Sequence, residues 1–374
     1  MKGCVKKTAF LRQEDVQWID DFLISAGLSD NFGMVVRNAV SEYVQKKKQA
    51  RAAVVFKISL AVLLGLFPLL ARCEISDNDL RKLFIITGAS GDEKYGGVVL
   101  FKSHFDKNKT ACAYKKSHPE TTIFIDQEGG SVVRIADAAP PSPAQARTMR
   151  DADFYEAVKK SAKKLKSACI DVNLAPVVEV NADPSRAYGA VPEEAIPKAR
   201  AFSQAMQSEG IKTVLKHFPG WNEHCTEVKE LNSIKLKVRP QSEAHRCSVR
   251  EDERYLFTEK VKVFSKVPSN AWMVSNTVIP ELGPYPSSMN PVIHDFARGD
   301  IGYKGLLISD ALWEIEASPK AVVMALKVVD WVMVGYAADV EAAIPYIREA
   351  LKRGLITESE LQAKLRRIAA FKEN

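Results

Sequence analysis

Short apolar runs rich in β-branched residues recur along the chain from residue 83 onward, with polar and amphipathic stretches between them. Eight such runs are LFIIT (83–87), GVVLF (97–101), TIFID (122–126), IDVNLAP (170–176), KTVLKHF (212–218), AWMVS (271–275), LLISD (306–310) and WVMVG (331–335). Runs that are hydrophobic on both faces and alternate with helical patterns, such as residues 157–168 and 344–352, indicate a buried parallel sheet. Eight strand–helix units over about 300 residues predict an α/β fold, a (β/α)8 TIM barrel, for residues 75–374.

Residues 1–50 have the pattern of a small separate helical unit. Apolar residues within 16–26 and within 32–44 recur at three- and four-residue steps, which predicts two amphipathic helices after a short extended stretch. Over residues 4–48 this order resembles the ribbon-helix-helix DNA-binding proteins, which place a paired strand in the major groove. The resemblance implies nucleic acid as a partner of this segment. The alternative is a helical hairpin without a DNA-binding role.

Residues 52–71, AAVVFKISLAVLLGLFPLLA, are almost continuously apolar and follow a basic run from Lys46 to Arg51. This layout is typical of a signal sequence or membrane anchor, and we expect one of these over residues 52–73. The positive-inside bias then places residues 1–51 in the cytoplasm and the rest outside, on the periplasmic side of a bacterial membrane. A buried barrel helix in a cytoplasmic protein is the alternative.

The composition excludes several other classes of protein. Apolar residues make up 46% of the 374-residue chain, which is typical of a globular protein. The net charge of +7 is modest and spread out apart from the basic run, so we expect no extended nucleic-acid channel. The six cysteines stand far apart without a C-x-x-C pair or a short Cys/His spacing, so we expect no disulfide framework and no metal site. We expect no cofactor either.

Polar residues end several of the apolar runs. In a (β/α)8 barrel the active site lies at the carboxyl ends of the strands, where these residues would meet. Carboxylates accept hydrogen bonds from sugar hydroxyls and cations donate to them, so the set suits a polyhydroxylated substrate. Taken alone, Asp310 could also be a helix N-cap, and His217 could be a buried core histidine. The run-ending residues are Asp126, Asn173, Lys216, His217, Ser275 and Asp310.

A resemblance to a known family rests on six segments. They are IDQEGGSVVRI (125–135), DVNLAPVVEVN (171–181), KHFPG (216–220), MVSNTVIPEL (273–282), PSSMNPVI (286–293) and GYKGLLISDAL (302–312). In order and spacing they resemble the β-N-acetylglucosaminidases of glycoside hydrolase family 3, over most of residues 78–372. The resemblance implies retaining hydrolysis of terminal β-N-acetylglucosaminides, in bacteria usually during recycling of cell-wall muropeptides. An amino-sugar or muropeptide ligand is thus the expected partner.

The same resemblance implies roles for individual residues. Asp310 matches the nucleophile that forms the glycosyl-enzyme, and Asp126 matches an aspartate that grips sugar hydroxyls. The other matches line the pocket or contact the sugar, and they are Arg134, Arg186, Lys216 and His217.

The loop after KHFPG departs from the family pattern. Family members continue as H-G-x-x-x-x-D-S-H, and the final Asp and His form the acid/base dyad. Here Glu227 and Lys229 occupy those two places. Lysine titrates near pH 10.4 and is a poor proton donor, and loss of acid/base assistance costs about 10²- to 10⁴-fold in rate. Asn276 and Ala311 also replace a usual histidine and a usual second acid.

Three interpretations of this loop remain open. His224 could swing in as the acid/base group, or Glu227 could act as the acid, as carboxylates do in most glycosidases. The third is a barrel that binds amino sugars without cleaving them. A metal site built from His217, His224, Cys225 and Glu227 is disfavoured, because the spacing matches no known ligand set. A membrane-tethered regulator, with residues 1–50 on DNA and the barrel as sensor, is a further alternative.

Overall fold

The computed structural model describes residues 74–88, 95–105, 111–180, 183–220, 260–279, 285–315 and 318–373, and the backbone of residues 226–227 and 247–248. The helical unit predicted for residues 1–50, the apolar segment 52–71 and His224 lie outside the described residues. Within the described part of the chain, none of the helices combines the length and the apolar character that a membrane span needs.

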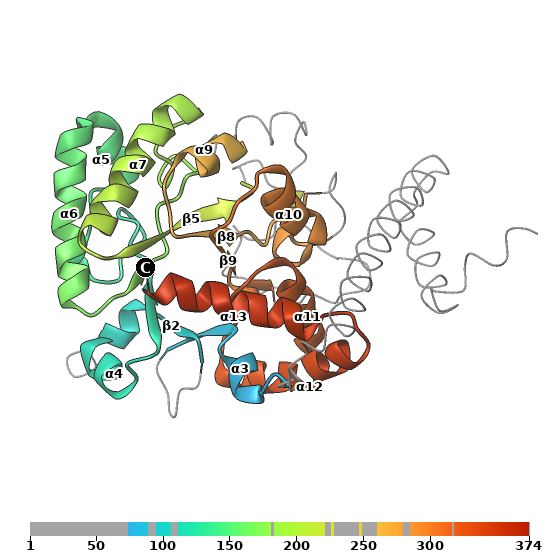
Figure 1. Ribbon diagram of the computed structural model, residues 1–374. Coiled ribbons are helices and arrows are strands. Elements are labelled where there is room, and N and C mark those ends of the chain that lie inside the picture. The colour runs from blue at the N-terminus through green and yellow to red at the C-terminus, as the bar shows by residue number, and fades with distance from the viewer. Residues whose placement is uncertain are drawn as a thin grey trace, which may run out of the picture. The chain divides into compact units, whose positions relative to one another are not determined.

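Eight parallel strands form a closed barrel at the centre of the fold (Figure 1). They are β1 (Phe84–Thr87), β2 (Gly97–Leu100), β3 (Thr122–Ile125), β4 (Val172–Asn173), β5 (Lys212–Phe218), β8 (Ala271–Val274), β9 (Leu306–Ser309) and β10 (Val332–Met333). The sheet order is β10-β1-β2-β3-β4-β5-β8-β9, and a parallel bridge from Ile308 to Trp331 closes the ring between β9 and β10. Each strand falls within one of the eight predicted runs, so the TIM barrel is confirmed.

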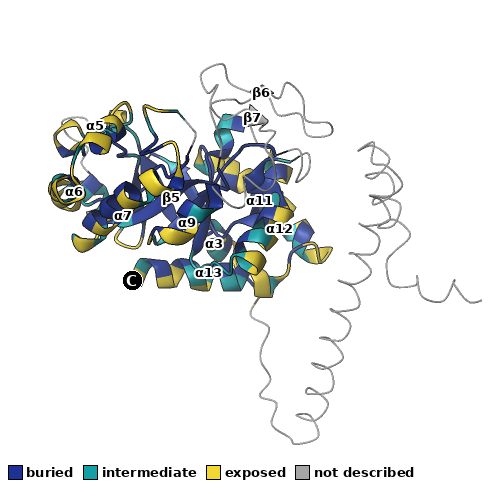
Figure 2. Cartoon of the chain, turned by 90° about the horizontal axis from the view of Figure 1, so that it is seen from above, coloured by how far each residue is buried: buried dark blue, intermediate teal, exposed yellow. Residues whose placement is uncertain are grey.

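The strands are apolar on both faces because both faces are covered. Every residue of β2, β3, β8 and β9 is buried. Aromatic rings fill part of the space around them: Phe218 stacks on Trp272 at a centroid distance of 5.0 Å, and Trp272 stacks on Tyr303 at 3.7 Å. Figure 2 shows the buried residues gathered around the strands, with the exposed ones on the outer faces of helices such as α6. Packing on both sides thus explains the absence of polar alternation in the sequence.

Helices form the outer layer of the barrel. They are α3 (Asp77–Arg81), α4 (Ala111–Ser117), α5 (Pro143–Thr148), α6 (Asp151–Ser167), α7 (Pro192–Ser208), α9 (Val261–Lys266), α10 (Pro291–Asp295), α11 (Pro319–Val328), α12 (Ala337–Lys352) and α13 (Glu358–Glu373). The predicted helices 157–168 and 344–352 are present as α6 and α12, but both begin earlier. Their first turns carry the acidic residues Asp151, Asp153 and Asp339, which stabilise the amino terminus of a helix. Because these residues are polar, the apolar pattern alone does not show where the two helices begin.

A disulfide bond joins Cys112 of α4 to Cys169, which follows α6. The two Cα atoms are 4.9 Å apart, although 57 residues separate the cysteines in the sequence. The spacing of the cysteines predicts no disulfide framework and so fails to predict this bond. The barrel brings α4 and the end of α6 together, and that proximity is not visible in the spacing of the cysteines.

Candidate active site

The two aspartates expected to act on the substrate lie on opposite sides of the barrel mouth. Asp126 follows β3 and Asp310 follows β9, and these strands are four places apart in either direction around the ring. Since all eight strands are parallel, both carboxylates stand at the same end of the barrel. The closed sheet therefore places them around one opening.

A cluster of paired charges forms one side of this mouth. The Lys216 ammonium, at the end of β5, lies 2.8 Å from an Asp126 oxygen and 2.7 Å from a Glu128 oxygen. The Arg186 guanidinium donates to both oxygens of Glu128, at 3.0 and 2.8 Å. Arg134 reaches the second oxygen of Asp126 at 3.3 Å. The structure thus brings together four predicted residues from three separate segments, and Glu128 links Arg186 to the other three through Lys216.

Glu128 is the most buried member of this charged cluster, with 3% of its side chain exposed. Burial acts to raise the pKa of its carboxyl, but Lys216 and Arg186 outweigh burial and hold the pKa at about 2. Burial likewise acts to lower the pKa of Lys216, and Asp126 with Glu128 reverses this, so that its pKa is raised. Both groups are charged at neutral pH, and the cluster offers the substrate fixed charges instead of a titrating acid.

His217 is held by a carboxylate that the sequence reasoning missed. Its Nδ1 lies 3.1 Å from an oxygen of Glu179, and both side chains are buried. A carboxylate can only accept, so Nδ1 carries the proton, and this fixes the orientation of the ring. Glu179 stands in the run PVVEV, where an acid in an otherwise apolar stretch was the available signal. Glu128, directly after Asp126 and Gln127, was the corresponding signal for the charged cluster.

Asp310 is 5% exposed at the end of β9, and backbone hydrogen bonds fix its position. Its N–H donates to the Val274 carbonyl at 2.8 Å, and the Ala311 N–H donates to Asp310 Oδ1 at 2.8 Å. The carboxylate is thereby set by the strand end and does not depend on a flexible loop. A buried carboxylate facing a charged mouth is suited to attack on an electrophilic carbon.

The sequence matches the model of the glycosyl hydrolase family 3 N-terminal domain from residue 91 to residue 371. The chain belongs to glycosyl hydrolase family 3. The match includes the strands β2 to β10, the charged cluster and Asp310.

Relatives in this family include fungal and bacterial proteins. A protein of Arthroderma benhamiae described as an uncharacterized secreted glycosyl hydrolase is 27% identical, over 75% of this chain and 86% of its own length. A beta-hexosaminidase of Stenotrophomonas maltophilia is 25% identical, over 57% of this chain and 66% of its own. The solved structure of a family 3 member from Mycobacterium smegmatis has a TM-score of 0.67 at 22% identity, covering 80% of this chain and 97% of that one. The last comparison supports the barrel fold.

The two departures from the family 3 pattern near Asp310 are adjacent in the fold. The Asn276 side-chain amide donates to the Ala311 carbonyl at 3.0 Å, and the Ser288 hydroxyl donates to the Asn276 side-chain oxygen at 2.7 Å. Asn276, Ser288 and Ala311 are all buried. A neutral hydrogen-bond network therefore stands where the family 3 pattern has a histidine and a second acid, and it supports the backbone after Asp310.

Of the two candidate acid/base residues, the structure describes only Glu227, and only its backbone. Glu227 lies in the short strand β6 (Thr226–Glu227), whose backbone pairs antiparallel with β7 (Cys247–Ser248) outside the barrel. His224 falls outside the described residues. The choice between the two therefore stays a prediction.

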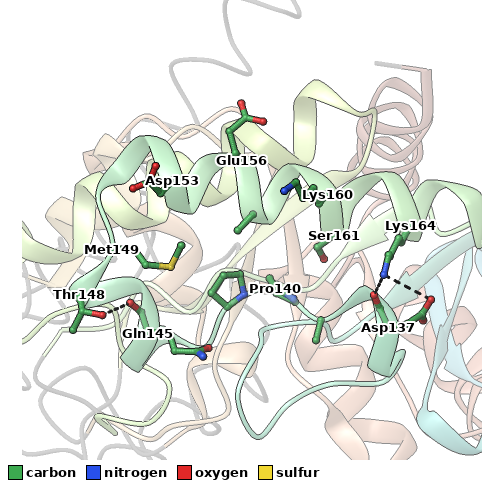
Figure 3. Close-up of a pocket in the computed structure, with 13 residues that line it drawn as sticks. Asp137, Pro140, Gln145, Thr148, Met149, Asp153, Glu156, Lys160, Ser161 and Lys164 are labelled. Atoms are coloured by element: carbon green, nitrogen blue, oxygen red, sulfur yellow. Dashed lines mark hydrogen bonds and ion pairs between the residues drawn. The ribbon is translucent and has the colours of Figure 1, made fainter.

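A groove of about 840 Å³ lies away from these residues, between α6 and the segment 137–149 (Figure 3). Lys164 closes one end by donating to the Asp137 backbone and pairing with its carboxylate at 3.9 Å. None of the predicted site residues is among its lining residues. The barrel mouth, and not this groove, is the candidate active site.

Proposed function

We propose that the chain hydrolyses terminal β-N-acetylhexosaminides with retention of configuration, and that Asp310 is the nucleophile. The observation that carries the proposal is the buried Asp310 carboxylate on the opposite side of the mouth from the charged cluster. Asp310 would attack the anomeric carbon while the bond to the leaving-group oxygen breaks. Water would then cleave the glycosyl-enzyme ester, release the sugar and restore the carboxylate.

The charged cluster would bind the non-reducing sugar. Asp126 accepts from sugar hydroxyls, while Lys216 and Arg134 hold that carboxylate in place. Arg186 holds Glu128, and each of these cations could also donate to the sugar. His217, whose ring is oriented by Glu179, would contact the same sugar. Because the cations are already paired, they would not need to reorganise when substrate binds, which favours tight and oriented binding.

The proton for the leaving group would come from the loop after Gly220. Glu227 as a carboxylic acid and His224 as an imidazolium are the two proposed donors. An activated aryl leaving group needs little acid assistance, whereas a sugar leaving group needs much more. We therefore expect high activity on aryl glycosides relative to disaccharides.

We further propose that the barrel acts outside the cytoplasm, on cell-wall muropeptide fragments. The disulfide between Cys112 and Cys169 supports export, because disulfides persist in oxidising compartments. The relative from Arthroderma benhamiae is described as secreted. The muropeptide assignment rests on the family resemblance. Membrane anchoring through residues 52–71 and DNA binding by residues 1–50 stay proposals about segments outside the described residues.

Turnover of 4-nitrophenyl N-acetyl-β-glucosaminide tests the activity. Asp310→Ala should lower kcat by about 10³-fold or more, because it removes the group that forms the covalent intermediate. Asp295→Ala, which removes a carboxylate that is 85% exposed on α10, should change kcat by less than about twofold. The first product seen by proton NMR should be the β-anomer.

Two outcomes would contradict this proposal. An α-anomer as first product would exclude the retaining mechanism. No turnover by the wild-type chain, together with saturable binding of N-acetylglucosamine, would instead make the barrel an amino-sugar-binding protein.

A further inference from the structure

Lysines from four separate elements gather at the amino ends of the barrel strands, at the opposite end of the barrel from the mouth. Each of them is partly exposed or exposed. The reaction proposed for the mouth does not use this end of the barrel. We call these residues the lysine cluster, and they are Lys115 of α4, Lys166 in the last turn of α6, Lys212 at the start of β5 and Lys372 in the last turn of α13.

The lysine cluster gathers around the carboxylate of Asp171, which directly precedes β4. Lys115 Nζ lies 2.8 Å from Asp171 Oδ2 and also donates to the Thr121 carbonyl at 2.8 Å. The same Oδ2 accepts a hydrogen bond from the Ile123 N–H at 2.8 Å. One carboxylate offsets one positive charge, so Asp171 balances Lys115 and leaves the cluster with an excess of positive charge.

Backbone groups hold the other lysines of the cluster close to one another. Lys212 Nζ donates to the Lys372 carbonyl at 3.4 Å, and Lys372 Nζ donates to the Glu120 carbonyl at 2.8 Å. A Cβ atom at Gly210, two residues before Lys212, would lie 3.5 Å from Lys166 Nζ. Carbonyl groups are neutral, so these hydrogen bonds fix Lys212 and Lys372 without removing their charge.

The lysines of the cluster are close enough to repel one another. Burial lowers the pKa of Lys212, and Lys166 and Lys115 lower it further, although Asp171 acts in the opposite direction. Burial also lowers the pKa of Lys372 to about 8, and Lys115 again acts in the same direction. An anion placed among these groups would relieve their repulsion, so the cluster should bind an anion more tightly than a single lysine does.

The disulfide bond holds the two sides of the lysine cluster together. Cys112 lies three residues before Lys115 on α4, and Cys169 lies two residues before Asp171. The bond between them therefore keeps α4, with its lysine, beside the strand end that carries the carboxylate. Groups that are fixed before a ligand arrives lose little entropy when they bind it.

We propose that the lysine cluster binds a phosphate group, either free phosphate or the phosphate of an anionic lipid headgroup. A phosphate offers several acceptor oxygens that face in different directions, which suits ammonium groups that come from different elements. A partner bound at this end of the barrel would leave the mouth open to substrate. The proposal goes beyond the function proposed for the mouth and does not depend on it.

Two probes, used with the full chain at low salt, test the site. Calorimetry measures binding of inorganic phosphate, and sedimentation measures binding to vesicles of phosphatidylcholine with and without phosphatidylglycerol. Lys166→Gln with Lys212→Gln should weaken the binding by about 20-fold, because each lysine beside an anionic surface contributes about fivefold. Lys166→Gln alone, at an exposed position, should weaken it by about fivefold without affecting the fold.

A matched control removes the same charge at the other end of the barrel. Lys102→Gln with Lys320→Gln replaces two exposed lysines, one directly after β2 and one in the first turn of α11. This variant should bind both probes within about twofold of the wild type. Lys212→Arg, which keeps the positive charge, should retain most of the affinity.

The two probes distinguish the two sources of phosphate. Binding of inorganic phosphate that the cluster variants weaken would assign free phosphate, and such binding to the phosphatidylglycerol vesicles alone would assign a lipid headgroup. Binding through the basic run from Lys46 to Arg51 would persist in the cluster variants, so it could not be mistaken for this site. No binding of either probe, or a loss no larger than in the matched control, would overturn the proposal.

Discussion

Glu128 is the central carboxylate of the charged cluster, because it forms ion pairs with both Lys216 and Arg186. The pKa of its carboxyl is lowered from 4.5 to about 2, so this carboxyl resists protonation in the folded protein. The resulting stability is fully present above about pH 4.5 and is lost as the pH falls towards 2, a total of about 3 kcal/mol. We therefore expect the free energy of unfolding to decrease as the pH is lowered. In Glu128→Gln, the share of this decrease that comes from protonation of Glu128 should be absent.

Urea unfolding between pH 3 and pH 6 measures this difference. Glu128→Gln should also be less stable than the wild type at pH 6, by about 3 kcal/mol, because it leaves two buried cations with one carboxylate fewer. Glu156→Gln, an exposed substitution on α6, should behave as the wild type at each pH. Parallel pH profiles for the wild type and Glu128→Gln would show that the ion pairs do not shift the carboxyl as described.

At the scale of elements, the disulfide fastens α4 to the carboxyl end of α6. It closes a long loop that contains β3 and the helices α5 and α6, so it restricts the unfolded chain considerably. Replacing both cysteines, Cys112→Ser with Cys169→Ser, should lower the free energy of unfolding by about 2–4 kcal/mol. Urea unfolding with and without reductant measures the effect.

The reductant should lower the stability of the wild-type chain and leave that of the double variant unchanged. Ser117→Ala, at an exposed position on the same helix, serves as the control and should keep the wild-type response. If mass spectrometry of the protein purified without reductant found both thiols free, the disulfide bond would be contradicted, and with it the support that the bond gives to the proposed export.

At the scale of the whole molecule, a buried ion cluster at the opposite end of the barrel joins three parts of the fold. Asp330, just before β10, accepts from Arg298 at 2.5 Å and from Arg367 of α13 at 2.6 Å. The Lys364 ammonium of α13 lies 4.0 Å away and donates to the Val329 carbonyl. Residues at the amino ends of barrel strands serve stability and not catalysis. The cluster therefore attaches the last helix to the barrel floor.

Because of Lys364, we expect the free energy of unfolding to increase as the pH rises into the alkaline range. Burial lowers its pKa to about 8 from 10.5, although Asp330 acts in the opposite direction. The folded protein thus disfavours the protonated lysine, and the cost is full below about pH 8. Stability should rise by up to about 3 kcal/mol between pH 8 and pH 10.5 as the proton is lost.

Urea unfolding at pH 7.5 and pH 9.5 checks this dependence. Lys364→Met should lack the rise that Lys364 contributes, whereas Lys352→Met, an exposed substitution on α12, should keep it. A rise of equal size in Lys364→Met would show that other groups cause the pH dependence.

The barrel and most of the residues at its mouth follow from the amino-acid sequence. Most of the strands are apolar on both faces, and this local property can be recognised in the sequence without knowledge of the neighbouring strands. Because parallel strands end at one face, the residues that terminate the runs, Asp126, Lys216 and Asp310, could be assigned to one opening before any contact was known.

Which of these residues contact one another depends on the three-dimensional fold. Glu128 and Glu179 stand beside predicted residues in the sequence, but their roles come from partners far along the chain: Glu128 pairs with residues 58 and 88 positions away. The disulfide bond likewise joins two residues that lie far apart in the sequence. Such contacts depend on the closure of the barrel, and closure leaves no local mark in the pattern of polar and apolar residues.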